Sequence, residues 1–363
     1  MADGLSRRDW LATAALAGIA PPHGAQAAAA GARARLSLNE NPFGPSPLVR
    51  QAILDQLQVL PRYVGDEARA LERQIAAREG VSPDQIILGE ILDALGLQLA
   101  LRGPVGGEFL YSEPGYTALV DAVAPGGGVA VGIPLNAKLE NDLPAFAARI
   151  GPRTRALYLV NPHNPSGTVS DTTSFKLFLR DASRRATVIV DEAYLEFEPD
   201  FAERTAVSLV RDGLDVIVFR TFAKIYGLAG LAIGYAVGPA GLAAELKRKG
   251  LGEPHGLNRL ALAAASASLR DPAYLDAVRA KVIAERALWH NLLDALKRPR
   301  SDSRGNFVLF DTGQPHDAFA AAMAAEGIDI ARAFPPLGTW ARISIGLPDE
   351  NARARAAVRK ILG

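Results

Sequence analysis

Short apolar segments alternate with helical segments through the first two thirds of the chain. Each apolar segment is apolar throughout, with no regular alternation of polar residues, which is typical of strands in a largely parallel sheet covered by helices on both faces. The sequence therefore predicts an α/β fold. The segments are 86–88, 109–111, 129–133, 156–160, 187–190, 216–219 and 233–237.

Polar groups follow three of these segments at their carboxyl ends. Asn161-Pro-His-Asn-Pro-Ser-Gly167 follows one, Asp191-Glu-Ala-Tyr194 follows the next, and Lys224 follows a third. Ligands of such sheets lie beyond the carboxyl ends of the strands, so we expect a binding site at this edge.

Lys224 is the candidate nucleophile of that site. An amine in a dry pocket has its charged form disfavoured, which makes it able to form an imine with a carbonyl cofactor. A lysine in a glycine-rich turn can equally extend its ammonium group to water, so the lysine alone does not decide the chemistry.

The pattern of elements changes near residue 272. A long helix at 274–296 is followed by a strand at 306–310, a helix at 316–326, a strand at 342–345 and a terminal helix. This order predicts a smaller α+β domain over 271–363, after a large domain over 56–270. Residues 28–55, rich in Pro, Gly and Asn, are expected to form an N-terminal arm and part of the small domain.

Four motifs together resemble a known family. They are NENPFG at 39–44, NPHNPSG at 161–167, DEAY at 191–194 and TFAKIYGLAG at 221–230. From about Leu36 onward the chain resembles a fold-type-I pyridoxal-phosphate (PLP) aminotransferase of the histidinol-phosphate aminotransferase branch. The resemblance implies a mostly parallel seven-stranded sheet and a transaminase activity. It also implies that an amino group moves between an amino acid or amine, histidinol-phosphate-like or aromatic, and a 2-oxo acid such as 2-oxoglutarate.

The resemblance assigns roles around the cofactor ring. Lys224 would hold PLP as an imine and move a proton, and Asp191 would pair with the protonated pyridine nitrogen so that the ring withdraws electrons. Asn164 and Tyr194 would donate to the ring's 3′ oxygen, and Tyr116 would stack on the ring. Taken as residues alone, Asp191 also fits a helix N-cap, and the other three fit turn or core structure.

The phosphate end is expected to use backbone and hydroxyl donors. The N–H groups of Leu92 and Asp93 start a helix, which is an anion-binding arrangement, and Thr221 is a further donor. Tyr63 matches a residue that the neighbouring subunit contributes, which implies a homodimer with shared active sites.

The same end departs from the family pattern. Ala223 stands where the family has a serine, and Ala232 stands where it has a phosphate-binding arginine. The turn that usually carries Gly-Ser or Gly-Ala reads Ile91-Leu92 here. Losing a charge-assisted, bidentate contact costs about 1.5–3 kcal/mol of binding, so we expect weaker PLP binding than the other motifs imply.

The resemblance also names candidate substrate-binding residues. Arg342 and Arg332 match arginines that hold the carboxylate or phosphate of the substrate, a role favoured by the bidentate geometry of the guanidinium group. Asn41 and Phe43 would lie on the arm over the site, and Asn306 would line the mouth of the pocket.

The N-terminus has the pattern of an export signal. Twin arginines, Arg7 and Arg8, precede an apolar stretch at 11–20 and an Ala-x-Ala site at 25–27. This pattern is similar to a Tat-type signal peptide over 1–27, and the stretch is too short to span a bilayer as a mature helix. We expect a periplasmic protein without a membrane anchor, or a cytoplasmic one if the signal does not function; an alanine-rich tail is the alternative reading.

Composition excludes several other classes. The formal net charge of +1 gives no support for nucleic-acid binding, and the absence of cysteine excludes disulfides and thiolate sites. Five histidines without an HExxH pattern argue against a zinc enzyme, and we expect no metal. The expected partners are small amino acids and 2-oxo acids.

Two other functions remain open at this stage. The same scaffold hosts PLP decarboxylases and lyases, which would share Lys224, Asp191 and Asn164. A non-catalytic periplasmic binding protein is the other, because Ala223 and Ala232 remove phosphate contacts. The identity of the amino donor is not determined by the sequence.

Overall fold

The computed structural model describes residues 33–363, which form one compact unit. The predicted signal at 1–27 lies outside the described residues. In the described part of the chain, no helix is both long and apolar enough to cross a bilayer.

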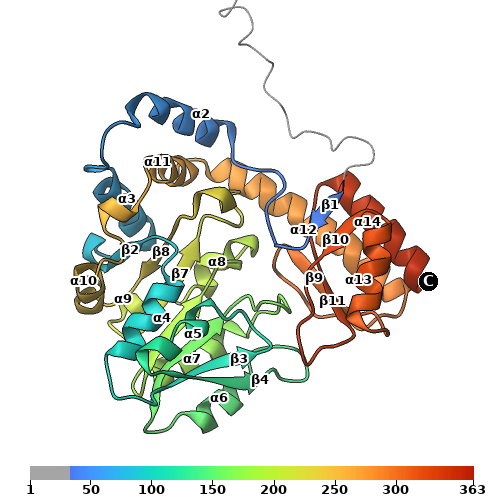
Figure 1. Cartoon of the computed structure of the whole chain (residues 1–363), viewed down its shortest axis with the longest axis horizontal. Helices are drawn as coiled ribbons and strands as arrows, with labels where there is room; N and C mark the ends of the chain where they lie inside the picture. Colours follow the sequence, from blue (N-terminus) through green and yellow to red (C-terminus); the bar gives the residue numbers. More distant parts are fainter. Residues whose placement is uncertain (1–32) are drawn as a thin grey trace, which may run out of the picture. The chain divides into compact units, whose positions relative to one another are not determined.

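A seven-stranded sheet forms the centre of this unit (Figure 1). The strands from β7 to β4 pair in parallel, whereas β8 runs antiparallel to both of its neighbours. The prediction of a mostly parallel α/β sheet is therefore confirmed, and each predicted segment is a strand. In spatial order they are β2 (Ile86–Leu88), β8 (Gly234–Val237), β7 (Val216–Thr221), β6 (Thr187–Asp191), β5 (Thr154–Val160), β3 (Glu108–Glu113) and β4 (Val129–Pro134).

Helices cover both faces of the sheet, as the apolar strands require. Val188 and Val190 belong to one buried cluster and Ile189 to the other, because successive strand residues point to opposite faces. The face of Ile189 packs on α4 (Leu92–Leu101), α5 (Ala118–Asp121) and α10 (Ala240–Arg248). The face of Val190 packs on α3 (Glu67–Glu79), α6 (Leu143–Arg149), α7 (Thr172–Ala182) and α9 (Val207–Arg211).

The C-terminal elements build two small sheets beside three helices. β9 (Phe307–Asp311) pairs antiparallel with β11 (Trp340–Ser344), next to α12 (Pro272–Ala295), α13 (His316–Ala325) and α14 (Pro348–Leu362). β1 (Ala34–Leu36) pairs in parallel with β10 (Ile328–Ile330), so the N-terminal arm joins this region. Three-residue strands are too short to show a periodic pattern, which is why the sequence did not reveal this pairing. The predicted domain boundaries stay predictions.

The remaining elements are short or connect the two regions. α2 (Pro47–Gln56) starts where Ser46 accepts a hydrogen bond from the Val49 N–H, and it packs on α11 (Arg259–Ser268). The others are α8 (Phe201–Arg204) and the 3₁₀ turns η1 (Leu57–Val59), η2 (Pro83–Gln85), η3 (Ala124–Gly126), η4 (Leu195–Phe197), η5 (Ala229–Leu231) and η6 (Pro254–Gly256).

A buried ion-pair network crosses the Val190 face of the sheet. Arg220, 1% exposed, lies 2.9 Å from Glu79 Oε1 and 3.0 Å from Glu192 Oε2. Its guanidinium also donates to Thr205 Oγ1 over 2.8 Å, and Tyr235 donates to Glu79 over 2.9 Å. Two buried carboxylates thus depend on one cation.

Replacing Arg220 with alanine is expected to lower the free energy of unfolding by about 3–5 kcal/mol, because two carboxylates would be left buried without a cation. Urea unfolding of the purified protein measures this change. Arg180→Ala is the matched control: it removes an exposed pair with Asp212 and should change stability by at most about 1 kcal/mol. Equal effects of the two substitutions would contradict the prediction.

Candidate active site

A cavity of about 480 Å³ opens at the carboxyl edge of the central sheet. Its wall comes from the turns after β2, β3, β5, β6 and β7, from the turn before β8, from the N-terminal arm and from the C-terminal region. The lining residues are Ser37, Leu38, Asn39, Glu90, Leu92, Gly115, Tyr116, Asn164, Asp191, Ala193, Tyr194, Phe219, Thr221, Ala223, Lys224, Ala229, Ala232, Arg332, Phe334 and Arg342.

Lys224 lies in the turn that follows β7 and is partly exposed to this cavity. The turn is closed by a hydrogen bond from the Gly227 N–H to the Lys224 carbonyl, 2.9 Å long. Gly227 has a φ of 73°, and a Cβ there would come within 2.6 Å of the Gly44 backbone, so this turn requires glycine. The Lys224 Nζ lies 5.6 Å from the centroid of the Tyr194 ring. Among residues 33–363, no carboxylate forms a salt bridge with Lys224, so its amine can react with a ligand.

Asp191 is the last residue of β6 and is 2% exposed. It shares the sheet face of Ile189, where its Oδ2 accepts from the Tyr158 hydroxyl over 2.8 Å and its Oδ1 from the Ala193 N–H over 2.9 Å. Burial raises the pKa of Asp191 to about 6, against the opposing effect of these two hydrogen bonds and of the positive charge of Lys224. Among the described residues Asp191 has no salt-bridge partner, and a buried carboxylate of this kind pairs well with a protonated ring nitrogen.

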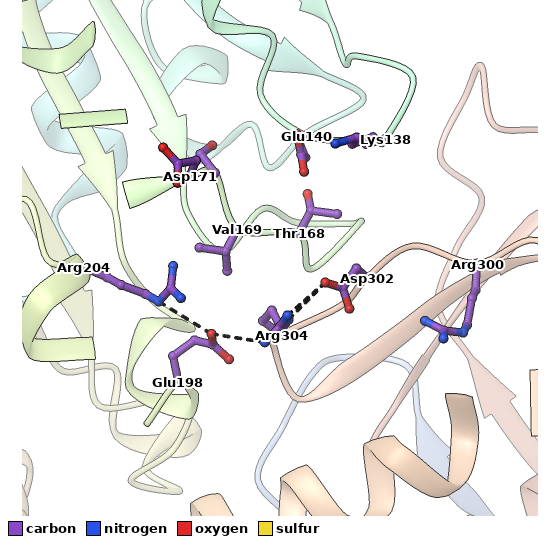
Figure 2. Close-up of a pocket in the computed structure, with 11 residues that line it drawn as sticks. Lys138, Glu140, Thr168, Val169, Asp171, Glu198, Arg204, Arg300, Asp302 and Arg304 are labelled. Carbon is purple, nitrogen blue, oxygen red and sulfur yellow. Dashed lines mark hydrogen bonds and ion pairs between the residues drawn. The ribbon is translucent and has the colours of Figure 1, made fainter. Parts of the chain in front are cut away.

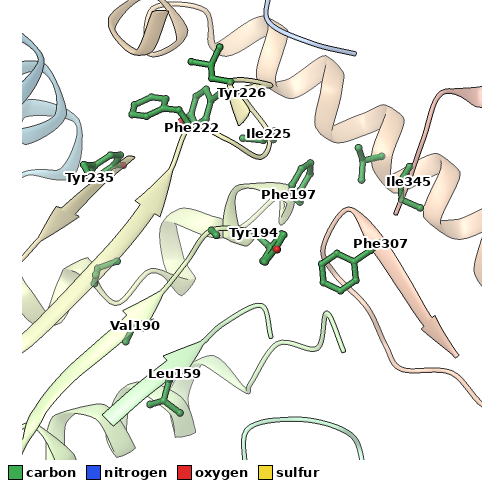
Figure 3. Close-up of a cluster of buried hydrophobic side chains, with 14 of the residues drawn as sticks. Leu159, Val190, Tyr194, Phe197, Phe222, Ile225, Tyr226, Tyr235, Phe307 and Ile345 are labelled. Atoms are coloured by element: carbon green, nitrogen blue, oxygen red, sulfur yellow. The ribbon is translucent and has the colours of Figure 1, made fainter. Parts of the chain in front are cut away.

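Asn164 and Tyr194 form one hydrogen-bonded group. The Asn164 Nδ2 donates to the Tyr194 hydroxyl over 3.4 Å, and Asn39 of the arm donates to the same hydroxyl over 3.3 Å. Figure 3 shows Tyr194 between the sheet and Phe307, and the two rings meet edge to face with centroids 5.2 Å apart. The Tyr194 ring is therefore fixed by packing, while its hydroxyl is shared among polar neighbours.

Arg342, on β11, is buried in the wall of the cavity without an acidic partner. Its Nη1 donates to Asn164 Oδ1 over 2.5 Å and its Nη2 to the Ser37 carbonyl over 2.9 Å, while its buried Nε has no partner. Burial lowers the pKa of Arg342 to about 10. In the described part of the chain, no carboxylate lies within salt-bridge distance of this guanidinium. Such a cation is suited to receive an anionic group of a ligand.

Tyr116 and Arg332 also line the cavity, at its more open parts. Tyr116 is 44% exposed, and burial of its hydroxyl, followed by the charge of Asp191, raises the pKa of Tyr116 to about 12. Arg332 is exposed and lies over the Phe334 ring at 4.8 Å. Tyr116 is therefore neutral at pH 7 and presents an aromatic ring.

Five predicted residues do not line the cavity. Asn41 and Asn306 hold the arm instead: Asn41 donates to the Ile225 carbonyl over 2.7 Å, and Asn306 donates to the carbonyls of Asn39 and Glu40 over 3.0 and 3.1 Å. These two residues position the arm that covers the site. The other three are Phe43, whose ring lies 4.9 Å from the Lys281 Nζ, and the exposed residues Tyr63 and Asp93.

Glu90 and three arm residues line the cavity although the sequence did not predict them. Glu90 follows β2 just as Asp191 ends β6, so its position after a strand was a signal that could have found it. Thr221 Oγ1 donates a hydrogen bond to Glu90 Oε1. Loss of water around the carboxyl group raises the pKa of Glu90 above its usual range, and the Thr221 bond opposes this shift. Ser37, Leu38 and Asn39 reach the cavity because β1 anchors the arm to β10.

A second cavity of about 430 Å³ has a different character (Figure 2). Four of its charged groups pair with one another: Arg304 lies 3.0 Å from Asp302 and 3.7 Å from Glu198, and Arg204 lies 3.7 Å from Glu198. It shares no lining residue with the cavity of Lys224. The reactive amine and the buried unpaired charges therefore belong to the first cavity.

The fold and this site define a class of enzyme. A lysine amine and a buried carboxylate at the ends of adjacent parallel strands, with hydroxyl and amide donors beside them, are suited to a carbonyl cofactor that carries a basic ring nitrogen. These are the features of a fold-type-I pyridoxal-phosphate enzyme.

Comparisons with known proteins identify the family. The profile of the family described as aminotransferase class I and II matches residues 34–359. A histidinol-phosphate aminotransferase of Limosilactobacillus fermentum is 32% identical over 330 residues, covering 90% of each chain. An aromatic amino acid aminotransferase of Thermobifida fusca is 36% identical over 322 residues, covering 88% of each chain. The chain belongs to the class I and II aminotransferases.

A solved structure shows the same fold. The crystal structure of histidinol-phosphate aminotransferase from Sinorhizobium meliloti in complex with pyridoxal-5′-phosphate superimposes with a TM-score of 0.82, at 30% identity and 96% coverage of each chain. The expectations of an aminotransferase, of transamination and of pyridoxal phosphate as the cofactor of the family are confirmed.

The residues of this chain fit one half of that cofactor better than the other. Lys224, Asp191 and Tyr194 surround the space for a pyridoxal ring with the chemistry that such a ring needs. The positions assigned to the phosphate carry Leu92, Ala223 and Ala232, and the carboxylate of Glu90 lies at the same end. The ring fits this site. At the other end Thr221 donates its proton to Glu90, so the N–H groups that start α4 are the donors left for a 5′ group, with no side-chain cation beside them among the described lining residues.

Proposed function

We propose that this aminotransferase takes its amino group from an amino acid or amine with an anionic group, histidinol-phosphate-like or aromatic, and passes it to a 2-oxo acid such as 2-oxoglutarate. The observation that carries this proposal is Arg342, a buried cation with an unpartnered Nε and no acidic neighbour in residues 33–363. Relatives named histidinol-phosphate and aromatic amino acid aminotransferases support the substrate class.

Four residues of the cavity have distinct roles in this chemistry. A bound pyridoxal ring supplies an electron sink for the substrate's Cα. Lys224 accepts and returns a proton at its Nζ, since it is the partly exposed amine of the cavity. Asp191 holds a positive charge on the ring nitrogen, Tyr116 offers its aromatic face, and Arg342 orients the substrate through its anionic group.

A panel of amino donors tests the proposal. We expect histidinol phosphate, phenylalanine, tyrosine or tryptophan to convert the protein's aldehyde cofactor to its amine form in a spectral titration. Adding 2-oxoglutarate should reverse the change. Carbon dioxide release without the amine form would indicate a decarboxylase instead, and no response to any donor would contradict the proposal.

Replacing Arg342 with glutamine is expected to lower kcat/KM for the preferred donor by about 10²-fold, mainly through KM, because a charge-assisted pair with the substrate is lost. Steady-state kinetics measure the effect. Arg304→Gln, in the second cavity, is the matched control and should leave kcat/KM near that of the parent. A pure loss of kcat with KM unchanged would argue against a substrate-binding role.

The proposed active site includes a residue of a second copy of the chain. We infer a homodimer in which Tyr63, 90% exposed in its own chain, reaches the neighbouring site. A monomer mass in light scattering would contradict the homodimer.

We infer a periplasmic location from the Tat-like pattern at 1–27, and a fusion reporter that stays cytoplasmic would contradict that location.

A further inference from the structure

The geometry of a pyridoxal ring decides which protein groups meet its 5′ arm. The ring nitrogen and the carbon that bears the aldehyde lie at opposite ends of one axis. The 3-hydroxyl and the 5′ arm lie on opposite sides of that axis. With the nitrogen at Asp191 and the aldehyde carbon at Lys224, a 3-hydroxyl toward Tyr194 and Asn164 sends the 5′ arm to the other side.

The order of strands shows what that other side contains. Asp191 ends β6, Lys224 follows β7, and Asn164 follows β5. In the opposite direction the sheet continues through β8 to β2, where Ala232 and Glu90 stand. Thr221 at the end of β7 pairs with Gly234 at the start of β8, and a Cβ on Gly234 would lie 3.2 Å from Glu90 Oε1. Glu90 is therefore packed into the end of the cavity that receives the 5′ arm.

The charges at this end do not suit a phosphate. The basic residues that line the cavity, among those described, are Lys224, Arg332 and Arg342. Lys224 faces the aldehyde. Arg342 is held by Asn164 and Ser37, and Arg332 lies with it over the Phe334 ring, so both arginines belong to the C-terminal wall of the cavity. Ala223, Ala232 and the side chain of Leu92 give no polar donor, and the carboxylate of Glu90 would repel a dianion.

A neutral hydroxymethyl group matches the same surroundings. A hydroxyl can donate to a Glu90 oxygen and accept from the first N–H groups of α4, for which Ile91 provides no side-chain cap. Once its second proton is lost, a phosphate ester has no proton to donate, so at neutral pH it mainly accepts hydrogen bonds. The carboxylate of Glu90 thus accepts from a hydroxymethyl group but repels a phosphate, for which this end keeps the α4 N–H groups and no side-chain cation among the described residues.

We propose that this cavity binds the vitamin B6 ring with a free 5′-hydroxymethyl group, as in pyridoxal or pyridoxamine, in preference to the 5′-phosphate ester, and that Glu90 makes the distinction. The proposal rests on the transamination function and names the form of the ring that this chain takes. Glu90 contacts the 5′ arm and is a specificity-determining residue.

The test compares pyridoxine with pyridoxine 5′-phosphate on the purified full chain by calorimetry. Neither compound has an aldehyde, so imine formation does not enter and the difference reports the 5′ group alone. We expect pyridoxine to bind at least about tenfold more tightly, since a phosphate meets a carboxylate and no cation. In parallel, pyridoxal and PLP are titrated against Lys224 by the visible absorbance of the imine.

Variants separate the 5′ contact from general effects. Glu90→Gln should shift the preference by about tenfold toward the phosphate, because the repulsion is removed while an acceptor oxygen stays. The double variant Ala223→Ser, Ala232→Arg should tighten binding of the phosphate about ten- to hundredfold by restoring charged donors. Ala232 already has a φ of 47°, so arginine there needs no new backbone conformation. Asp302→Asn, in the second cavity, is the control and should leave the preference unchanged.

The outcomes distinguish this inference from the function on which it rests. Equal or tighter binding of the phosphate by the parent would overturn the hydroxymethyl preference and leave transamination standing. A parent preference that Glu90→Gln does not alter would overturn the role of Glu90. Absence of an imine with both pyridoxal and PLP would overturn the proposed function, and this inference with it.

Discussion

Lys224→Ala is expected to abolish the imine absorbance and to lower amino-group transfer by about 10³-fold. The cavity holds one partly exposed lysine amine next to the Asp191 carboxylate, and no other lysine lines it among the residues described. The variant should still fold, because Lys224 forms no salt bridge in the described part of the chain and its ring contact with Tyr194, at 5.6 Å, is long.

Three measurements make this prediction specific. Single-turnover conversion of the donor reports the proton transfer, the visible spectrum reports the imine, and thermal unfolding reports the fold. Lys281→Ala, which removes a lysine that lies over Phe43 outside the cavity, is the control and should keep both activity and spectrum. Partial rescue of Lys224→Ala by a small added amine would support the proton-transfer role, and unchanged turnover in the variant would refute it.

The second large effect is expected at Asp191. Asp191→Asn keeps the shape and one of the two acceptor oxygens next to Tyr158 and Ala193 but removes the negative charge that pairs with the ring nitrogen. We expect kcat to fall by about 10²–10⁴-fold, because the ring then loses its ability to withdraw electrons.

The pH dependence of ring binding separates charge from shape. Burial raises the pKa of Asp191 from 3.8 to about 6. Below about pH 6 the carboxyl is protonated, so affinity for the ring should fall as the pH falls through that value. The raised pKa also means that this group favours the fold less as the pH rises from 3.8 to about 6. In Asp191→Asn both dependences should vanish, and a variant with the pH profile of the parent would show that another group titrates.

Amino-group transfer needs the ring half of the site, and the structure retains that half. Lys224, Asp191, Asn164 and Tyr194 lie where the strand ends bring them together, and Arg342 reaches Asn164 from β11. The end of the cavity that would receive the 5′ arm of the ring contains Glu90 instead of a side-chain cation. The two halves are consistent if the chain handles a B6 ring that carries no phosphate.

Local sequence was enough to predict the sheet and the residues at its carboxyl edge. Strands β5, β6 and β7 are apolar because both of their faces are buried, and that pattern is visible without coordinates. The motif residues follow directly from their strand ends, so a parallel sheet brings Asn164, Asp191 and Lys224 to one edge whatever the details of packing. The export pattern at 1–27 stays a prediction, because it lies outside the described residues.

The tertiary structure alone decided which other residues enter the site. Asn41 and Phe43 were expected on the arm over the site and Asn306 at the mouth of the pocket. The arm residues that line the cavity are instead Ser37, Leu38 and Asn39, next to the pairing of β1 with β10. Glu90 lies beside Thr221 because β8 lies between β2 and β7 in the sheet. These pairings join segments far apart in the sequence, so no local pattern predicts them. Periodicity and motifs report contacts near in sequence, whereas the charge balance of the cavity depends on strands that are distant along the chain.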